Sequence, residues 1–219
     1  MTTALERIER TTQALKVFPL PSAVLFPHEA LPLHIFEPRY RDLVRDALAG
    51  DKVMALGQLE PGWESQYGGR PPLQPMLCAG VIVLDEELPD GRYNIFLQGV
   101  SRARLVEELP ADKLYREARV ELLPDPPFEG PEEELLRQAV FELAGRVPPS
   151  FAENLLPAVA RASGGALADV VAAAVVPEAE RRQELLCELD VRARLEAVLD
   201  EVGGLLARLS PMKPLGPLN

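Results

Sequence analysis

A cluster of prolines divides this chain of 219 residues into two parts of different composition. The segment PDPPFEGP, residues 124–131, holds three prolines within its first four residues. Because proline lacks a backbone N–H and clashes with a preceding helical turn, neither a helix nor a central strand continues through such a segment. We therefore predict a strand-rich part at residues 15–124 and a helical part at residues 131–209. The flanking segments are an N-terminal extension, residues 1–14, and a tail, residues 210–219.

Short apolar runs, interrupted by proline and glycine, make up the first part and predict about six strands. We expect mostly antiparallel neighbours in a sheet curled into a barrel. The expected strands are residues 15–20, 30–36, 52–59, 76–88, 92–109 and 116–124.

Local signals fix several turns of the first part. Pro38 suits the first turn of a helix whose apolar residues recur every three or four positions, and Gly50 is the expected C-terminal cap. The sequence Asp90-Gly91 lies between two apolar runs and predicts a β-hairpin. Gly99, inside the following strand, predicts a bulge or a close approach of two backbones.

Apolar residues of the second part recur at helical spacing and predict a helical bundle. Ser150 and Glu153 have the spacing of a capping box, and Asp190 is an expected N-cap. The stretch at residues 167–176 is nearly all apolar, so we place its helix at the centre of the bundle. A further helix is expected at residues 178–189. The fold class is therefore α+β, a barrel with one helix followed by a helical bundle.

The charge of the chain excludes some classes of partner. A formal net charge of −11 and a sequence pI near 4.8 oppose binding to nucleic acid or to anionic membranes. No apolar run is long enough to span a bilayer, and the first fifteen residues lack the apolar centre of a signal peptide. We expect a cytoplasmic protein. Cys78 and Cys187 lie in apolar runs, and both are expected to be buried thiols.

Sequence motifs of catalysis are not found. His28 and His34 stand six residues apart without a nearby cysteine, a spacing that matches no common metal site. Neither a GxxxxGK[ST] phosphate loop nor a GxSxG nucleophile motif occurs. We therefore assign no catalytic, cofactor-binding or metal-binding residues, and we expect a protein that is not an enzyme.

The stretch FPLPSAVLFPHEALPLHIFEPRYRDLV, residues 18–44, resembles the opening signature of the N-terminal domain of Lon protease. Its features are a leucine-proline start, a turn at Phe26-Pro27, a Pro32-Leu33 pair and a helix that begins with proline and arginine. Gly99 and Arg102 match the glycine-then-arginine strand of that family. With weaker helical matches further on, the resemblance covers about residues 15–205.

This resemblance implies a PUA-like β-barrel followed by a helical bundle, and a free-standing substrate-binding domain. The chain stops at Asn219 without an ATPase or peptidase motif. The resemblance thus implies a non-catalytic module that binds other proteins, such as an adaptor for unfolded client proteins or for a protease. A monomer or a weak homodimer is expected. The alternative is a small-molecule-binding protein or a small enzyme that uses a pocket in the barrel.

Residues that we expect to contact a partner fall in two segments. Trp63 and Tyr67 lie in a polar, glycine-rich loop where an aromatic side chain can anchor a partner, although Trp63 can instead fold back over the barrel. His34, Glu37 and Arg39 form the second group, within a short stretch that concentrates polar groups. The remaining large side chains of this stretch are expected in the core: Phe26, Ile35, Phe36 and Tyr40.

Overall fold

The computed structural model describes residues 2–66 and 69–209, and contacts between residues divide the chain into two compact units. The first unit comprises Met1–Pro126 and Pro177–Leu189, and the second comprises Pro127–Val176 and Asp190–Asn219. The first crossing between the units thus falls inside the proline segment. On sequence grounds we placed residues 177–189 in the helical part, whereas their contacts group them with the strands.

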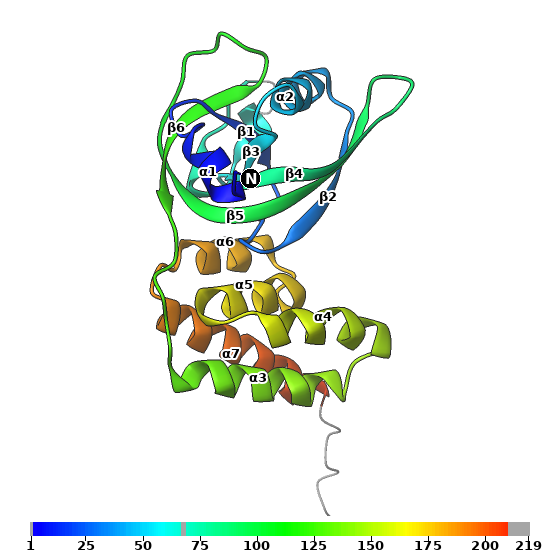
Figure 1. Cartoon of the computed structure of the whole chain (residues 1–219), viewed down its shortest axis with the longest axis vertical. Helices are drawn as coiled ribbons and strands as arrows, with labels where there is room; N and C mark the ends of the chain where they lie inside the picture. Colours follow the sequence, from blue (N-terminus) through cyan, green and yellow to red (C-terminus); the bar gives the residue numbers. More distant parts are fainter. Residues whose placement is uncertain (1, 67–68, 210–219) are drawn as a thin grey trace, which may run out of the picture. The chain divides into compact units, whose positions relative to one another are not determined.

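Five strands of the first unit close into a barrel, and a sixth strand extends the sheet (Figure 1). The strand order is β2-β5-β4-β3-β1-β6, and a pairing of β5 with β6 closes the ring. The described strand pairs are antiparallel except for β1 with β3. The predicted α+β fold with a barrel of about six strands is confirmed. The strands are β1 (Leu15–Leu20), β2 (Ala30–Ile35), β3 (Val53–Leu59), β4 (Leu73–Glu87), β5 (Tyr93–Glu108) and β6 (Arg116–Leu123).

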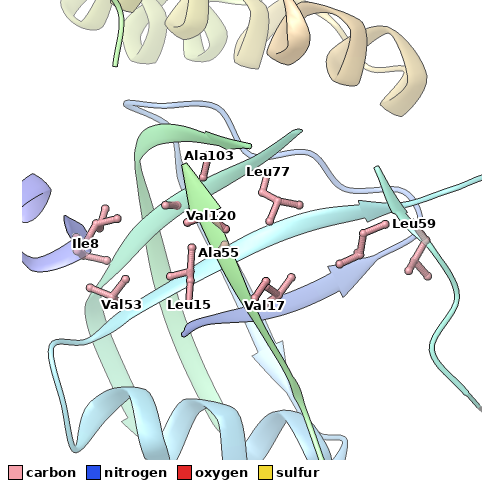
Figure 2. Packing of buried hydrophobic residues seen from close by; sticks show 13 residues of the cluster. Ile8, Leu15, Val17, Val53, Ala55, Leu59, Leu77, Ala103 and Val120 are labelled. Carbon is pink, nitrogen blue, oxygen red and sulfur yellow. The ribbon is translucent and has the colours of Figure 1, made fainter. Parts of the chain in front are cut away.

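Apolar side chains fill the barrel and point toward one another from several strands (Figure 2). They recur at every second position, as in Leu15 and Val17, because alternate residues of a strand face the same side. Ile8 joins this cluster from a short helix, α1 (Ala4–Glu9), which a capping box of Thr3 and Glu6 begins. Part of the segment that we expected as an N-terminal extension therefore packs on the barrel core.

Several predicted turns of the first unit can be compared with the structure. Helix α2 (Pro38–Leu48) begins at the predicted proline and buries one apolar face. The prediction of Gly50 as its cap is wrong, because the cap is Ala49 and the positive φ angle needed to reverse the chain occurs at Lys52, with φ 59°. The Asp90-Gly91 hairpin is confirmed, with Gly91 at φ 77°.

Gly99 occupies the predicted bulge. The register of β4 against β5 shifts beside Gly80, which pairs with Gly99. A Cβ atom on Gly99 would lie 2.1 Å from the carbonyl oxygen of Phe26, a distance that no real side chain tolerates. Glycine is therefore required here by the close approach of a second backbone.

Polar side chains tie helix α6 (Ala179–Cys187) to the barrel. Buried Arg102 donates from Nε to the carbonyl oxygen of Leu186 at 2.9 Å. Gln183 donates to the carbonyl oxygen of Met76 at 2.9 Å, and Arg182 forms an ion pair with Glu29 at 2.7 Å. These contacts explain why a helix that follows the bundle helices in sequence belongs to the barrel unit.

The two cysteines differ. Cys78 on β4 is buried, as predicted, whereas Cys187 at the end of α6 is exposed. The prediction of two buried thiols is therefore wrong for Cys187. Its neighbours Leu185 and Leu186 are buried instead.

The second unit contains four helices in its described residues: α3 (Pro131–Ala144), α4 (Pro149–Arg161), α5 (Gly164–Val175) and α7 (Val191–Leu209). The predicted cap at Asp190 is confirmed, since its Oδ1 accepts from the backbone N–H of Ala193 at 3.0 Å. The predicted capping box of Ser150 and Glu153 is wrong. Helix α4 has Pro148 as its N-cap and no side-chain capping bond, because a proline side chain carries no oxygen that could accept from the first turn.

A buried ion pair lies within the second unit. Arg194 of α7 and Asp169 of α5 are both fully buried, and Arg194 Nε lies 3.3 Å from Asp169 Oδ1. The two opposite charges offset each other's loss of hydration. Among the helices that the structure describes, none is long and apolar enough to cross a membrane.

Candidate functional site

The residues predicted to contact a partner lie at separate places of the first unit. His34 lies on strand β2, and Glu37 and Arg39 lie at the start of helix α2. Trp63 opens the short 3-10 helix η1 (Trp63–Gln66). Tyr67 lies outside the described residues. Of these groups, the surroundings of His34 show the largest gathering of exposed apolar side chains.

Beyond the closed barrel, three strand segments form a small sheet that we call the flap. The flap consists of β2, residues 83–87 of β4 and residues 93–97 of β5, which pair with one another. The hairpin joining β4 and β5 projects from the barrel (Figure 1). Pairing of β4 with β3 ends at Val81, and pairing of β5 with β6 begins only at Arg102. The flap therefore has two faces outside the barrel wall.

The inner face of the flap is buried. Ile35, Tyr93 and Ile95 are 1%, 4% and 1% exposed. Helix α2 contacts the tip of the hairpin, where a Cβ atom on Gly91 would lie 2.1 Å from Arg41 Nη2. The inner face is thus part of the folded core, and it holds the flap in place.

The outer face of the flap is apolar and exposed. Pro32, Phe96 and Leu84 are paired across the three strands, so their side chains form one row on the same face. Phe96 is 41% exposed and Leu84 is 60% exposed. A register shift adds exposed Val83 beside this row. A face turned toward water is ordinarily polar in an antiparallel sheet, so this composition is unusual.

Phe36 extends the same surface. Its ring stacks on the imidazole of His34 with centroids 6.2 Å apart, and its side chain is 60% exposed. The prediction that Phe36 belongs to the core is therefore wrong. Phe36 follows the last residue of β2, where Ile35 already takes the inward position, so Phe36 faces outward. The same prediction is right for Phe26, Ile35 and Tyr40, which are buried.

A row of polar side chains crosses the flap beside the apolar row. Nη1 of Arg92 lies 3.3 Å from His34 Nε2, and His34 Nδ1 lies 2.8 Å from Asn94 Oδ1. Because a guanidinium only donates, Nε2 must accept and Nδ1–H must donate in this arrangement. Asn94 then donates from Nδ2 to Glu86 at 2.9 Å. His34 thus links Arg92 to Asn94 in a surface hydrogen-bond network that ends on the carboxylate of Glu86.

Both open edges of the flap carry residues that oppose the addition of another strand. On β2, which pairs only with β5 among the described strands, Pro32 has no N–H to donate. On β4, the edge beyond Val81 carries three consecutive acids, Asp85, Glu86 and Glu87. Proline and charged side chains are common protections of strand edges.

Glu37 and Arg39 form an ion pair beside a small cavity. Arg39 donates from Nε to Glu37 Oε2 at 3.0 Å, and its guanidinium lies 4.6 Å from the ring centre of Tyr40. The cavity measures about 30 Å³. Sites for small molecules are usually about 300–1,000 Å³, so this cavity is suited to water alone. Its lining residues are Pro19, Leu20, Pro21, Glu37, Arg39, Tyr40, Leu59 and Pro71.

Trp63 packs against the apolar cluster of the barrel and is half-buried. This position agrees with the alternative that the indole folds back over the barrel, and its contact with a partner stays a prediction. Within residues 2–66 and 69–209, no group of three or more His, Cys, Asp or Glu side chains is arranged to hold a metal ion.

Sequence reasoning missed Leu84 and Phe96 as surface residues. Ile95, Phe96 and Leu97 form an unbroken apolar run, which gives no alternation from which an outer face can be inferred. The unbroken apolar run itself could have served as a signal. It makes both faces of this strand apolar, and only one of these faces packs inside the unit.

The sequence of this chain is similar to those of known proteins. The family model of the ATP-dependent protease La (LON) substrate-binding domain matches residues 14–203. A Lon protease of Paraburkholderia phytofirmans is 30% identical over 214 residues, which cover 93% of this chain and 26% of that protein. The chain thus spans about a quarter of the length of the Lon proteases that it matches.

Solved structures agree with the match. The Lon N-terminal domain protein from Xanthomonas campestris superposes with a TM-score of 0.66 at 25% identity, covering 86% of this chain and 98% of that one. The N-terminal domain of the Mycobacterium avium complex Lon protease, at 18% identity, shares the fold with a TM-score of 0.67 and covers 87% and 98% of the two chains. This chain therefore belongs to the family of Lon substrate-binding domains.

Proposed function

We propose that this protein is a non-catalytic module that binds exposed segments of other proteins, as an adaptor for unfolded clients or for a protease. The observation that carries the proposal is the family match over residues 14–203, which is a match to a substrate-binding domain. The exposed apolar face of the flap supports the proposal physically, because covering apolar side chains that face water lowers the free energy of the complex.

The proposal includes a reducing, cytoplasmic location and a monomeric or weakly dimeric state. Cys78 and Cys187 are both free thiols, which is usual in a reducing compartment. Size-exclusion chromatography with light scattering measures the oligomeric state directly. A stable complex of several copies at micromolar concentration would contradict the proposed state.

Binding to unfolded protein is the direct test of the proposed function. The purified full chain is titrated into fluorescently labelled lysozyme, either folded or reduced and carbamidomethylated. The two forms carry the same ionisable side chains, so a difference in affinity reports exposed segments and not net charge. We expect at least about tenfold tighter binding of the unfolded form. Equal affinity for both forms would contradict the proposal.

The adaptor role needs a second measurement. Degradation of the same unfolded lysozyme by a purified Lon protease is followed with and without this chain. We expect a faster initial rate at substrate concentrations below saturation, because an adaptor raises the local concentration of the client. An unchanged or slower rate, together with intact binding, would contradict the adaptor role while leaving the recognition role in place.

A further inference from the structure

We propose that the outer face of the flap is the surface that binds client segments, and that it selects extended segments in which aromatic or aliphatic residues stand next to lysine or arginine. This inference rests on the proposed function and adds its location, its mode of contact and its preferred chemistry. Three independent features of the flap support it: exposed apolar side chains, blocked strand edges and acidic surroundings.

The apolar side chains lie on a supported sheet and are therefore available without unfolding. Leu84 and Phe96 are 60% and 41% exposed, while Ile95, the direct neighbour of Phe96, is 1% exposed. Burial of the inner face fixes the strands, so the outer row keeps a constant spacing. Such a row presents one side chain from each of three neighbouring strands to a partner.

The blocked edges indicate contact through the face of the sheet. A client strand added to β2 would need a regular series of N–H and C=O groups, and Pro32 interrupts that series. On the β4 edge, a client strand would meet the side chains of Asp85, Glu86 and Glu87. A client lying across the outer face instead contacts Pro32, Leu84 and Phe96 through its side chains.

The charges around the face select the client. Glu86 ends the polar row on the outer face and Asp90 is exposed in the hairpin turn, whereas Asp85 and Glu87 pair with Ile95 and Tyr93 and so lie on the other side of the sheet. Two nearby cations are paired with acids: Arg92 with Asp90 at 2.7 Å and Lys52 with Asp85 at 2.9 Å. With a net charge of −11 on the whole chain, a client that carries cations beside its apolar residues is attracted. A second copy of this acidic chain, or an anionic membrane, is repelled.

Labelled peptides test the preferred chemistry. One fluorescein-labelled peptide alternates leucine or phenylalanine with lysine, and a second has glutamate in place of every lysine. Fluorescence anisotropy with the full chain should show at least about tenfold tighter binding of the lysine peptide. The affinity of the lysine peptide should fall with added salt. Equal affinities of the two peptides would overturn the preference for basic segments.

Backbone methylation of the lysine peptide tests the mode of contact. Methyl groups on alternate backbone nitrogens remove the N–H donors that strand addition requires, while the side chains stay in place. We expect the methylated peptide to bind within about threefold of the unmodified one. A loss of binding beyond about tenfold would overturn contact through the face and would favour strand addition.

Paired variants of the full chain test the location. The double variant Leu84→Thr, Phe96→Thr keeps side chains suited to strands and should weaken binding of the lysine peptide at least about tenfold. The matched control is Val106→Thr, Leu114→Thr, which changes two residues that are 51% and 70% exposed elsewhere in the barrel unit. The control should bind as the unsubstituted chain does.

The outcomes separate the two proposals. If the unsubstituted chain binds unfolded lysozyme and the flap variant binds it equally well, the flap assignment is wrong and the proposed function stands. If both double variants weaken binding equally, the surface is not confined to the flap, and the assignment is again wrong. If the unsubstituted chain binds neither unfolded lysozyme nor the lysine peptide, the proposed function is wrong and the flap assignment falls with it.

Discussion

The two faces of the flap both carry apolar residues, but one face is buried and the other is exposed. Ile95 and Phe96 are neighbours on β5, yet Ile95 is 1% exposed and Phe96 is 41% exposed. Successive side chains of a strand point to opposite sides, so one residue enters the core and the next meets water. Hydrophobicity alone therefore does not assign a residue to the core; the side of the sheet on which the residue lies decides.

This difference separates residues that stabilise the fold from residues that remain available for binding. Removing an inner side chain leaves a cavity and loses buried contacts. Removing an outer side chain changes an exposed surface, where substitutions usually have small effects on stability. Four predictions test this separation, from the largest expected effect to the smallest.

The largest effect is expected for Ile95→Ala on the inner face. The substitution should lower the free energy of unfolding by about 2–5 kcal/mol, because it creates a cavity in a packed core. Urea unfolding followed by the fluorescence of Trp63, the single tryptophan of the chain, reports on the barrel unit. Phe96→Ala is the matched outer variant and should cost clearly less. Equal losses of unfolding free energy for the two variants would contradict the distinction between the inner and outer faces.

The next largest effect is expected at the root of the flap, for Gly99→Ala. The new methyl group would meet the carbonyl oxygen of Phe26 at 2.1 Å, so the free energy of unfolding should fall by about 1–3 kcal/mol. Gly203→Ala, in helix α7, is a control with open space around it and should raise stability by about 0.5–1 kcal/mol. A stabilising effect of Gly99→Ala would show that the bulge is not tightly packed.

A smaller, pH-dependent effect is expected for the anchor of helix α2, which contacts the hairpin tip. Tyr115 donates from its hydroxyl to Asp46 Oδ2 at 2.5 Å, and Tyr115→Phe should cost about 1 kcal/mol near neutral pH. Burial, followed by the hydrogen bond to Asp46, raises the pKa of Tyr115 to about 12 from an ordinary value of 10.0.

The sign of the pH dependence follows from this raised pKa. Between about pH 10 and 12 the unfolded chain has lost the Tyr115 proton while the folded chain retains it, so stability falls as the pH rises. Unfolding free energies measured across this window should fall less steeply for Tyr115→Phe than for the unsubstituted chain. Identical slopes would contradict the assigned pKa.

The smallest effect on stability is expected on the outer face. Leu84→Thr and Phe96→Thr should each change the free energy of unfolding by no more than about 0.5 kcal/mol, because the two residues are 60% and 41% exposed and threonine suits a strand. Urea unfolding of each variant measures the change. A loss near that of Ile95→Ala would mean that the outer face is packed in solution.

Local patterns of the sequence predicted much of the fold. Pro38 began α2, Asp90-Gly91 formed the hairpin, and Gly99 lies at a bulge, because each signal depends on backbone geometry within a few residues. The capping predictions were less successful: Asp190 caps α7, whereas Ser150 does not cap α4. Helix α4 instead has its N-cap at Pro148, two residues before Ser150, because Pro149 suits the first position of a helix.

The candidate site was predicted in part. His34 lies on the flap beside the exposed apolar row, while Leu84 and Phe96 were not identified and Phe36 was assigned to the core. Apolar residues on both sides of a strand give no alternation, so the sequence offers no way to tell the covered face from the open one.

By itself, the sequence determined most of the strands and helices and the family signature at residues 18–44, since these depend on local propensity and on motifs. Only the tertiary structure decided which residues meet across long separations. It grouped α6 with the barrel through Arg102 and Arg182, paired Arg194 with Asp169 in the bundle, and left Phe96 exposed. The physical reason is that burial and pairing of a side chain depend on which element covers it, and that element is distant in sequence.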